Sequence, residues 1–357
     1  MTSNARELAQ IPSTPSGRRN LIINGAMQVA QRGTSETGIG ISDGYFTADR
    51  FRINVASSSV NAGRLTMTQE SDGPSVVGLT KSVKLACTTA DTSIGAAEFF
   101  ILEQRIEGQD VQRLSKGTSD AKEVTVSFYV KSSSNITFVA ELLDVTNVRT
   151  ISKSFNVTTD WTRVELTYPA DTTGIIADNA NEGFRLLIWM HAGSDFSSGS
   201  LQTSWGAVNN PDRAVGCGSI VDSTSRTFSI TGVQLEVGSV ATEFEHRSFG
   251  EELALCRRYF ESSSFPSGTS SNTNKVTGVA DDSSGLDFIQ GFPFMETKRV
   301  APTMTVTDFQ ELDGSGVTTG TFTAFDQGVD RLLRFTIGAS VTTGRPYRFH
   351  YTADAEL

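Results

Sequence analysis

The sequence predicts an all-β protein with a large jelly-roll sandwich, a short amphipathic helix and a smaller C-terminal β-domain. Segments in which apolar and polar residues alternate recur along most of the chain, separated by turn residues at intervals of roughly 10 to 20 residues. No segment with helical periodicity lies between these segments before residue 248, which excludes a βαβ architecture. Only Phe249 to Phe260 changes to helical spacing.

Length, charge and cysteine content narrow the possible functions. A chain of 357 residues is too long for one ordinary core, so we expect more than one domain. The net charge of −10 argues against nucleic acid and anionic membranes as partners. We find neither an apolar run long enough for membrane insertion nor a signal-peptide pattern. Cys87, Cys217 and Cys256 are far apart in the sequence, which indicates free thiols in a protein made in a reducing cytoplasm.

The chain begins with a segment, residues 1–19, that has too few apolar side chains to fold alone, and we interpret it as a flexible arm. Residues 20–247 form the predicted jelly roll. Its first strand-like segment, 21–33, contains an Asn24-Gly25 turn signal and should lie beside the last strand, 227–237. The strands predicted between these two are 47–56, 64–71, 82–89, 97–108, 123–132, 135–144, 152–158, 162–170 and 184–192.

A helical neck is predicted over residues 248–262. Ser248 and Glu251 have the spacing of a capping box, which places the start of the helix. One face of the helix would carry an apolar stripe that must be buried against the flanking domains or against other copies of the chain. The stripe comprises Phe249, Leu253, Cys256 and Phe260, and we predict that it forms an oligomer interface.

Alternation returns in residues 263–357, which predict a C-terminal β-sandwich. Two groups of side chains in it are candidates for ligand binding. In the last strand, Tyr347, Phe349 and Tyr351 should share one face, with Arg348 and His350 on the other, and the alternative is that the aromatic side chains simply fill the core. The ligand-binding candidates are Arg345, Tyr347, Arg348, His350 and Tyr351, together with Phe292 and Phe294 as an exposed patch.

Three phrases of the sequence resemble a family of bacteriophage tail-fibre and minor virion proteins. They are NLIINGAMQVAQRG (20–33), YFTADRF (45–51) and ITGVQLEVGSVATEFEHRSFGEELALCRRYF (230–260). The resemblance extends over about residues 20 to 260. It departs from the family at Phe51, where a tryptophan is expected, but one aromatic side chain replaces another there. The arrangement of this region is also similar to that of carbohydrate-binding modules.

The resemblance implies a structural virion protein, and a tail fibre that attaches the particle to host-surface glycan or an outer-membrane receptor is the first expectation. Alternatives are a head or baseplate fibre or decoration protein, and a non-viral carbohydrate-binding module. Fibres of this kind are typically homotrimers, so the resemblance supplies the number three and the helical stripe only permits it. The chain would be made in the host cytoplasm and end in the virion. Its arm would contact other virion proteins through Arg6, Arg18 and Arg19.

The sequence gives little sign of catalysis or of a metal site. Residues Gly40 to Gly44 match the GxSxG pattern, but they lack the strand and helix that a nucleophile elbow requires, so we interpret them as a turn. We therefore expect no enzyme and no cofactor. The alternative is a structural calcium ion, because Asp178, Asn179, Asn181 and Glu182 form an oxygen-rich loop, although without EF-hand spacing.

Aromatic side chains outside strands are candidates for stacking on sugar rings. Trp161 and Trp189 lie within predicted strands and should fill the core. Trp205 is the only tryptophan in a predicted loop, so it is a ligand-binding candidate, and the alternative is that it covers the core.

Overall fold

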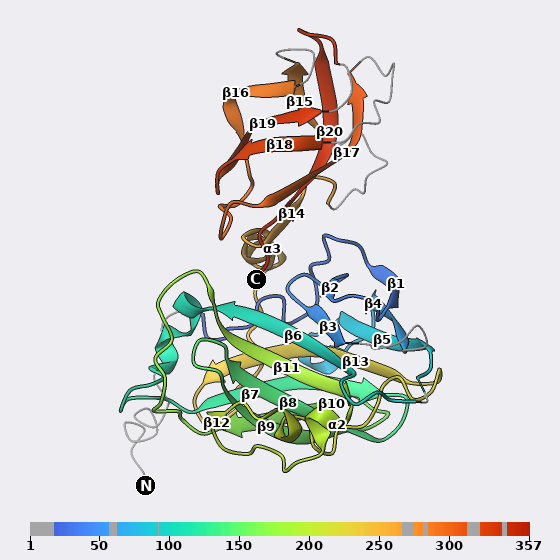
Figure 1. The fold of residues 1–357 in the computed structure, drawn as a ribbon, viewed down its shortest axis with the longest axis vertical. Coiled ribbons are helices and arrows are strands. Elements are labelled where there is room, and N and C mark those ends of the chain that lie inside the picture. The colour runs from blue at the N-terminus through green and yellow to red at the C-terminus, as the bar shows by residue number, and fades with distance from the viewer. Residues whose placement is uncertain are drawn as a thin grey trace.

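The computed structural model describes residues 18–56, 63–91, 93–265, 275–280, 285–312, 322–337 and 341–357. The chain is all-β, as predicted, and forms a large sandwich and a smaller C-terminal β-domain with a short helix between them (Figure 1). Arg6 and most of the expected arm lie outside the described residues. None of the described helices is long and apolar enough to cross a membrane.

The first sheet of the sandwich has six antiparallel strands. Strand β13 is central, because it pairs with β5 on one side and with β7 on the other. A bulge between Thr231 and Gln234 interrupts its pairing with β7. In spatial order the strands are β1 (Ser35–Ile39), β4 (Arg64–Glu70), β5 (Ser82–Thr89), β13 (Thr227–Val237), β7 (Val124–Ser132) and β10 (Thr162–Tyr168).

The second sheet has seven antiparallel strands, with β11 and β6 at its centre. Short helical segments lie in the connections: η1 (Ser75–Val77), η2 (Gly108–Leu114), α2 (Ser194–Ser197) and η3 (Asn210–Asp212). In spatial order the strands are β12 (Gly206–Ala207), β9 (Arg149–Val157), β8 (Ile136–Asp144), β11 (Glu182–Ala192), β6 (Phe99–Glu107), β3 (Arg52–Ala56) and β2 (Gly44–Tyr45).

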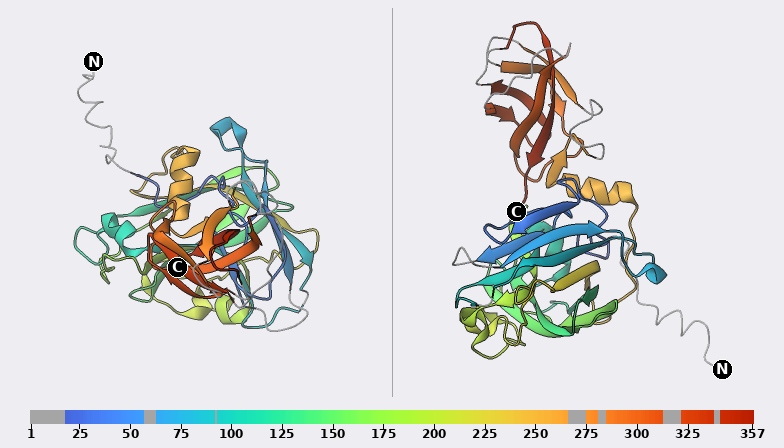
Figure 2. Two further views of the ribbon diagram at one scale, coloured as in Figure 1. Left: turned by 90° about the horizontal axis from the view of Figure 1, so that it is seen from above. Right: turned by 90° about the vertical axis from the view of Figure 1, so that its right-hand side faces the viewer.

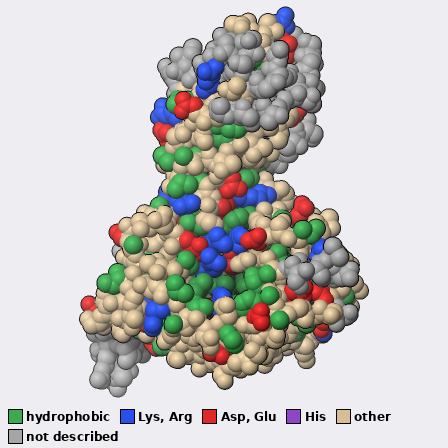
Figure 3. Space-filling view, viewed as in Figure 1, with side chains coloured by type: hydrophobic (Ala, Val, Ile, Leu, Met, Phe, Trp, Pro, Cys, Tyr) green, Lys and Arg blue, Asp and Glu red, His purple; other side chains and the backbone are tan. Residues whose placement is uncertain are grey.

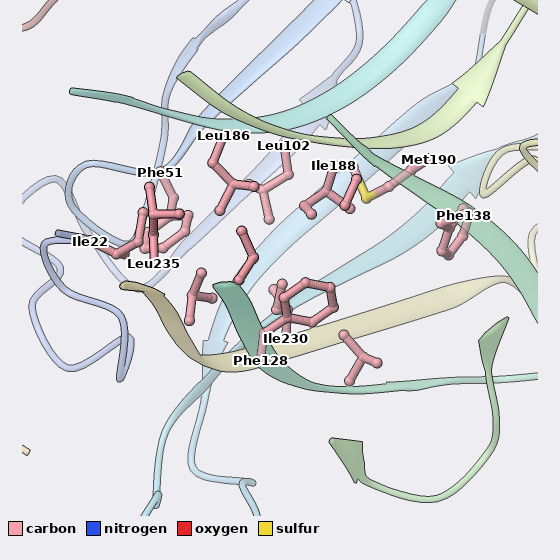
Figure 4. Close-up of a cluster of buried hydrophobic side chains, with 14 of the residues drawn as sticks. Ile22, Phe51, Leu102, Phe128, Phe138, Leu186, Ile188, Met190, Ile230 and Leu235 are labelled. Carbon is pink, nitrogen blue, oxygen red and sulfur yellow. The ribbon is translucent and has the colours of Figure 1, made fainter. Parts of the chain in front are cut away.

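The main hydrophobic core fills the space between the two sheets. Leu186, Ile188 and Met190 point inward from β11, toward Phe128 of β7 and Ile230 of β13 (Figure 4). These side chains are at every second position, so the alternation seen in the sequence directly encodes the inner faces. All five are almost completely buried.

The segment 21–33 is not a strand, which corrects the prediction. It is buried, and Asn24 begins a turn closed by the Met27 N–H to Asn24 carbonyl bond of 2.9 Å. Its backbone groups form isolated hydrogen bonds instead of a ladder, such as Leu21 N–H to the Leu235 carbonyl at 2.9 Å, or they bond to side chains. The expected proximity to the last strand is confirmed, since this partner belongs to β13.

The predicted helix exists but is shorter than expected. Helix α3 runs over Phe249–Arg257, and Ser248 caps it with both bonds of the capping box in place. The chain then turns, and β14 (Phe260–Ser262) already belongs to the C-terminal sheet. Phe260 is therefore a strand residue, not part of a helical stripe.

The C-terminal domain is one seven-stranded antiparallel sheet, where the sequence predicted a sandwich. Strand β20 is its organiser, because β14, β15 and β17 all pair with it. Its aromatic side chains form a separate core. The strands after β14 are β15 (Val276–Ala280), β16 (Gly285–Pro293), β17 (Thr303–Glu311), β18 (Phe322–Gln327), β19 (Arg331–Ile337) and β20 (Pro346–Asp354).

Candidate functional site

The start and the end of the sandwich meet beside α3, and we call this region the junction. Glu245 accepts hydrogen bonds from the backbone N–H groups of Arg19 at 2.8 Å and Asn20 at 2.9 Å. Burial alone would raise the pKa of Glu245, but these two bonds and Arg247 outweigh it and lower the pKa. A charged carboxylate therefore ties together residues 226 positions apart.

Asn24 connects four parts of the junction. Its side-chain amide donates to the carbonyls of Val29 at 2.8 Å and Asp49 at 3.0 Å, and its oxygen accepts from Val29 N–H. Its own N–H donates to Glu252 of α3. Gly25 follows because a Cβ there would lie 2.1 Å from the Val233 carbonyl oxygen, so no other residue fits without displacing β13.

A buried arginine links the sandwich to the C-terminal end of the described chain. Arg50 is 1% exposed and pairs with Glu356, while it also donates to the Arg105 carbonyl at 2.6 Å. Its guanidinium lies 3.5 Å from the ring centroid of Tyr259. The pairing with Glu356 outweighs burial, so the pKa of Arg50 is raised. One buried arginine of the sandwich therefore contacts both Tyr259 and Glu356, which lie outside the sandwich.

Further ion pairs surround this arginine. Arg32 bridges to Asp354 at 3.2 Å and Glu356 at 3.4 Å, and its guanidinium lies 3.6 Å from the ring centroid of Phe260. Arg258 donates two bonds of 2.8 Å to Glu107 of β6. In Figure 3, basic and acidic side chains accordingly gather where the C-terminal domain meets the sandwich. Buried and bidentate ion pairs of this kind are strong contacts, and several of them connect the two domains.

The apolar side of α3 is buried in the same chain. Cys256 is 0% exposed and packs with Ile23, Val29 and Tyr259, and Leu253 lies against this cluster. Phe260 is also buried, while Phe249 is 47% exposed. The expected oligomer stripe is therefore corrected: Cys256 and Phe260 are covered by residues 23–29 and by the C-terminal domain, and cannot reach a neighbouring chain.

A groove runs along the outer side of α3 (Figure 2 shows the helix between the two domains). Its volume is about 750 Å³. Arg18 lines it, and among the described residues its guanidinium donates to the carbonyls of Asn20 and Leu21. Burial and the neighbouring Arg247 lower the pKa of Arg18. The other lining residues are Glu245, His246, Arg247, Glu251, Ala254, Leu255, Arg258, Glu296 and Thr297.

The arm residues that the structure describes are tied to the sandwich itself. Arg19 pairs with Glu236 at 3.4 Å and donates to the Glu243 carbonyl at 2.7 Å. Arg18 donates to the carbonyls of Asn20 and Leu21, at the start of the same domain. Both side chains fix the start of the domain, and their contact with other virion proteins stays a prediction.

The ligand-binding candidates of β20 do not form one surface. Tyr347 and Tyr351 are buried in the C-terminal core with Phe349, as the aromatic-core alternative predicted. His350 faces the other side but is 1% exposed, with its Nδ1 3.3 Å from the Ser263 hydroxyl. Arg345 is exposed and paired with Glu311, and Arg348 is half-buried.

The second C-terminal candidate is also a core feature. Phe294 is 7% exposed, and its ring centroid lies 6.2 Å from that of Tyr351. Phe292 is half-buried and packs edge-on against the same tyrosine at 5.5 Å. The prediction of an exposed aromatic patch is wrong here, because strand pairing turns both rings toward β20.

Trp205 covers the end of the sandwich core. Its indole N–H donates to the Pro169 carbonyl at 2.8 Å, and its ring lies 6.2 Å from Phe184. The ammonium of Lys116 is 5.4 Å from the indole centroid. This is the core-covering alternative of the sequence analysis.

Beside Trp205, an ammonium group occupies an oxygen cage. Lys116 Nζ lies 2.5 Å from Asp144 Oδ2, 2.9 Å from Asp171 Oδ2 and 2.8 Å from the Thr173 carbonyl oxygen. The side chains of all three charged residues are at most 4% exposed. The described residues contain no group of three or more His, Cys, Asp or Glu arranged to hold a metal ion. The calcium site expected at residues 178–182, which also relied on Asn179 and Asn181, stays a prediction.

No family model matches this chain, and no curated protein matches it. Among solved structures it is similar to a CBM4 protein, at 14% identity over 60% of this chain and 97% of the other, with a TM-score of 0.31. It is also similar to a family 11 carbohydrate-binding module from Clostridium thermocellum, at 10% identity over 58% of this chain and 98% of the other, with a TM-score of 0.27. A third similar structure is the CBM22-1 xylan-binding domain of Xyn10C from Paenibacillus barcinonensis, at 10% identity over 63% of this chain and 100% of the other, with a TM-score of 0.27. The fold is defined by the strand pairing described above.

Proposed function

We propose that this chain is a non-enzymatic structural protein of a bacteriophage particle, of the tail-fibre type, that attaches the particle to a host-surface glycan or outer-membrane receptor. One observation carries the proposal: the three phrases that resemble phage virion proteins supply the side chains of the junction, where they join residues up to 228 positions apart. What the resemblance marks is therefore the joint that fixes one domain to the other. Rigid coupling of successive domains suits a fibre that must hold a receptor-binding end away from a particle.

Oligomerisation belongs to the same proposal. The chain forms a homotrimer, which would turn weak single-site contacts into firm attachment. Because Cys256 and Phe260 of the stripe are buried within the chain, the interface must use other surfaces, of which the groove beside α3 and the exposed ring of Phe249 are nearest to the neck. Light scattering on the purified chain tests this, and a stable monomer at micromolar concentration would remove the trimer from the proposal.

Labelled electron microscopy of purified particles tests the location. A label on the tail supports the fibre proposal, whereas a label on the head or baseplate favours the decoration or baseplate alternatives. Absence of label from every particle, with the chain present in the infected lysate, would contradict a virion role. Incubation with host polysaccharide should release no new reducing ends, and their appearance would contradict the non-enzymatic assignment.

A further inference from the structure

The outer face of the first sheet has a depression that arises from strand register. Ser229 of β13 lies directly opposite Lys84 of β5 on one side and Lys131 of β7 on the other. Directly opposed residues project from the same face of a sheet. A short side chain between two long ones leaves a trough, with Ser229, 4% exposed, at its floor.

The trough has a volume of about 220 Å³. That is below the ≈300–1,000 Å³ of pockets for drug-sized ligands, so it suits a single small ring. Its walls are polar throughout. The lining residues are Glu70, Asp72, Lys84, Lys131, Ser132, Thr159, Thr227 and Ser229.

The charged walls neutralise each other. Lys131 pairs with Asp72, and Lys84 lies 3.7 Å from Glu70. Two cations and two anions leave no net charge, which argues against an anionic or cationic ligand. The same four groups offer charged donors and acceptors on both sides of a neutral molecule, where hydrogen bonds to ionised partners are the stronger kind.

Three hydroxyl groups in the trough are unused. Within the described part of the chain, the side-chain hydroxyls of Thr159, Thr227 and Ser229 make no hydrogen bond. Each hydroxyl can donate one bond and accept two. A ligand with several hydroxyls of its own would satisfy them, whereas an apolar ligand would leave them unpaired.

A half-exposed indole lies next to the trough. Trp161 donates through its Nε1 to Asp72 at 3.3 Å, and Lys131 Nζ is 5.1 Å from its ring centroid. Asp72 thus holds both Lys131 and Trp161 in place. Trp161 adds apolar surface beside polar walls, the combination that recognises a sugar, with its hydroxyl edges and C–H faces.

We propose that this trough binds one pyranose ring of a neutral glycan. The inference rests on the proposed adhesive function and names the ligand class for it. Ser229, Thr227 and Thr159 hydrogen-bond the sugar hydroxyls at the floor and rim, and Lys84 and Lys131 close the sides. The strand register that forms the trough cannot be read from any single segment of the sequence.

Saturation-transfer NMR with the methyl glycosides of glucose, galactose, mannose and N-acetylglucosamine tests the proposal. At least one glycoside should receive saturation from the full chain. Ser229→Leu, which fills the trough, should weaken its binding by about tenfold or more, equivalent to about 1.4 kcal/mol. Thr66→Leu is the matched control, because Thr66 lies on the same outer face in β4, outside the trough, and makes no side-chain hydrogen bond to a described residue.

Binding by Thr66→Leu should remain within about twofold of the natural chain, and thermal unfolding of both variants verifies that they are folded. If none of the four glycosides receives saturation, or if both variants bind equally, the proposal is overturned. Labelled particles distinguish this failure from failure of the virion role. If particles carry the chain but no glycoside binds, only the glycan proposal is contradicted. If a glycoside binds but the chain is absent from particles, only the virion role is contradicted.

Discussion

The outer faces of the two sheets of the sandwich differ in how their charged groups are arranged and buried. The outer face of the second sheet carries Glu103, fully buried beneath Arg52, Arg105 and Arg185, and it is covered by α2, η3 and the end of the chain. The outer face of the first sheet carries hydroxyls and paired surface charges around the trough. This face of the first sheet is covered in part as well, since Gln234 and Glu236 are buried beneath residues 242–245, but the trough lies on another part of it.

The ion pairs on the two faces also differ in how much they contribute to stability. Burial raises the pKa of Glu103, but the three arginines outweigh burial and lower it overall, so the group is ionised and fully committed. On the first sheet, Glu165 is 51% exposed and pairs with Arg163 at 3.0 Å. An exposed pair of that kind contributes about 0–1 kcal/mol.

The largest effect should follow from removing the buried carboxylate. Glu103→Ala leaves three arginines facing each other, and we expect a loss of about 3–5 kcal/mol in the free energy of unfolding. Glu165→Gln on the first sheet should change it by less than about 0.5 kcal/mol. Urea denaturation measures both, and equal losses would abolish the distinction between the faces.

Lys116→Met tests the oxygen cage at the edge of the second sheet. The substitution keeps the length of the side chain but leaves Asp144 and Asp171 buried without their cation, so we expect a loss of about 3 kcal/mol. Arg149 still pairs with Asp171, which limits the effect. The same denaturation measurement applies, and an unchanged midpoint would show that the ammonium is dispensable.

The junction should depend on pH through Asp49. Burial raises its pKa to about 6, against the opposing pull of Arg32 and Gln31. The folded chain therefore holds this proton at pH values where the unfolded chain, with a value near 3.8, has lost it. Stability from this group falls as the pH rises from about 4 to about 6, on the order of 2–3 kcal/mol in all.

Asp49→Asn should lack that contribution. The difference in unfolding free energy between the natural chain and Asp49→Asn should thus shift by the same amount between about pH 4 and about pH 7. Comparing the two proteins cancels the contributions of other carboxylates. A difference that stays constant with pH would contradict the raised pKa.

The smallest effect concerns the helix between the domains. Ser248→Ala removes the side chain that accepts from Glu251 N–H at 3.3 Å, and a lost N-cap costs about 1 kcal/mol. Ser248→Thr keeps the oxygen and should recover most of that loss. Hydrogen exchange of the α3 amides measures it locally, and identical protection in both variants would show that tertiary contacts alone hold the helix.

Local pattern was enough to predict most strands and the start of α3. The strand predicted over 135–144 is Ile136–Asp144, and the Ser248–Glu251 capping box is present. Segment 21–33 alternates equally well but is not a strand, because side chains such as that of Asn24 satisfy its backbone. The sequence did contain one sign of this, the Asn24-Gly25 turn signal, and in the structure Asn24 has a positive φ of 60°.

The trough arises from long-range strand pairing, so no local sequence pattern could predict it. Ser229 is an ordinary strand residue until Lys84 and Lys131 are brought to its two sides. The strand pattern predicts Trp161 in the core, yet in the structure it is half-exposed at the edge of the trough. Conversely, the conspicuous aromatic side chains of β20 proved to be core.

The way the sandwich is tied off has a mechanical consequence. Its first described residues are bonded to the segment that leads into α3, through Glu245 and Arg247. A force that pulls Arg18 and Ser248 apart would therefore act first on these hydrogen bonds. The thirteen described strands between the two residues would carry little of that force. A module suspended in this way can bear on a surface without being unravelled by the load.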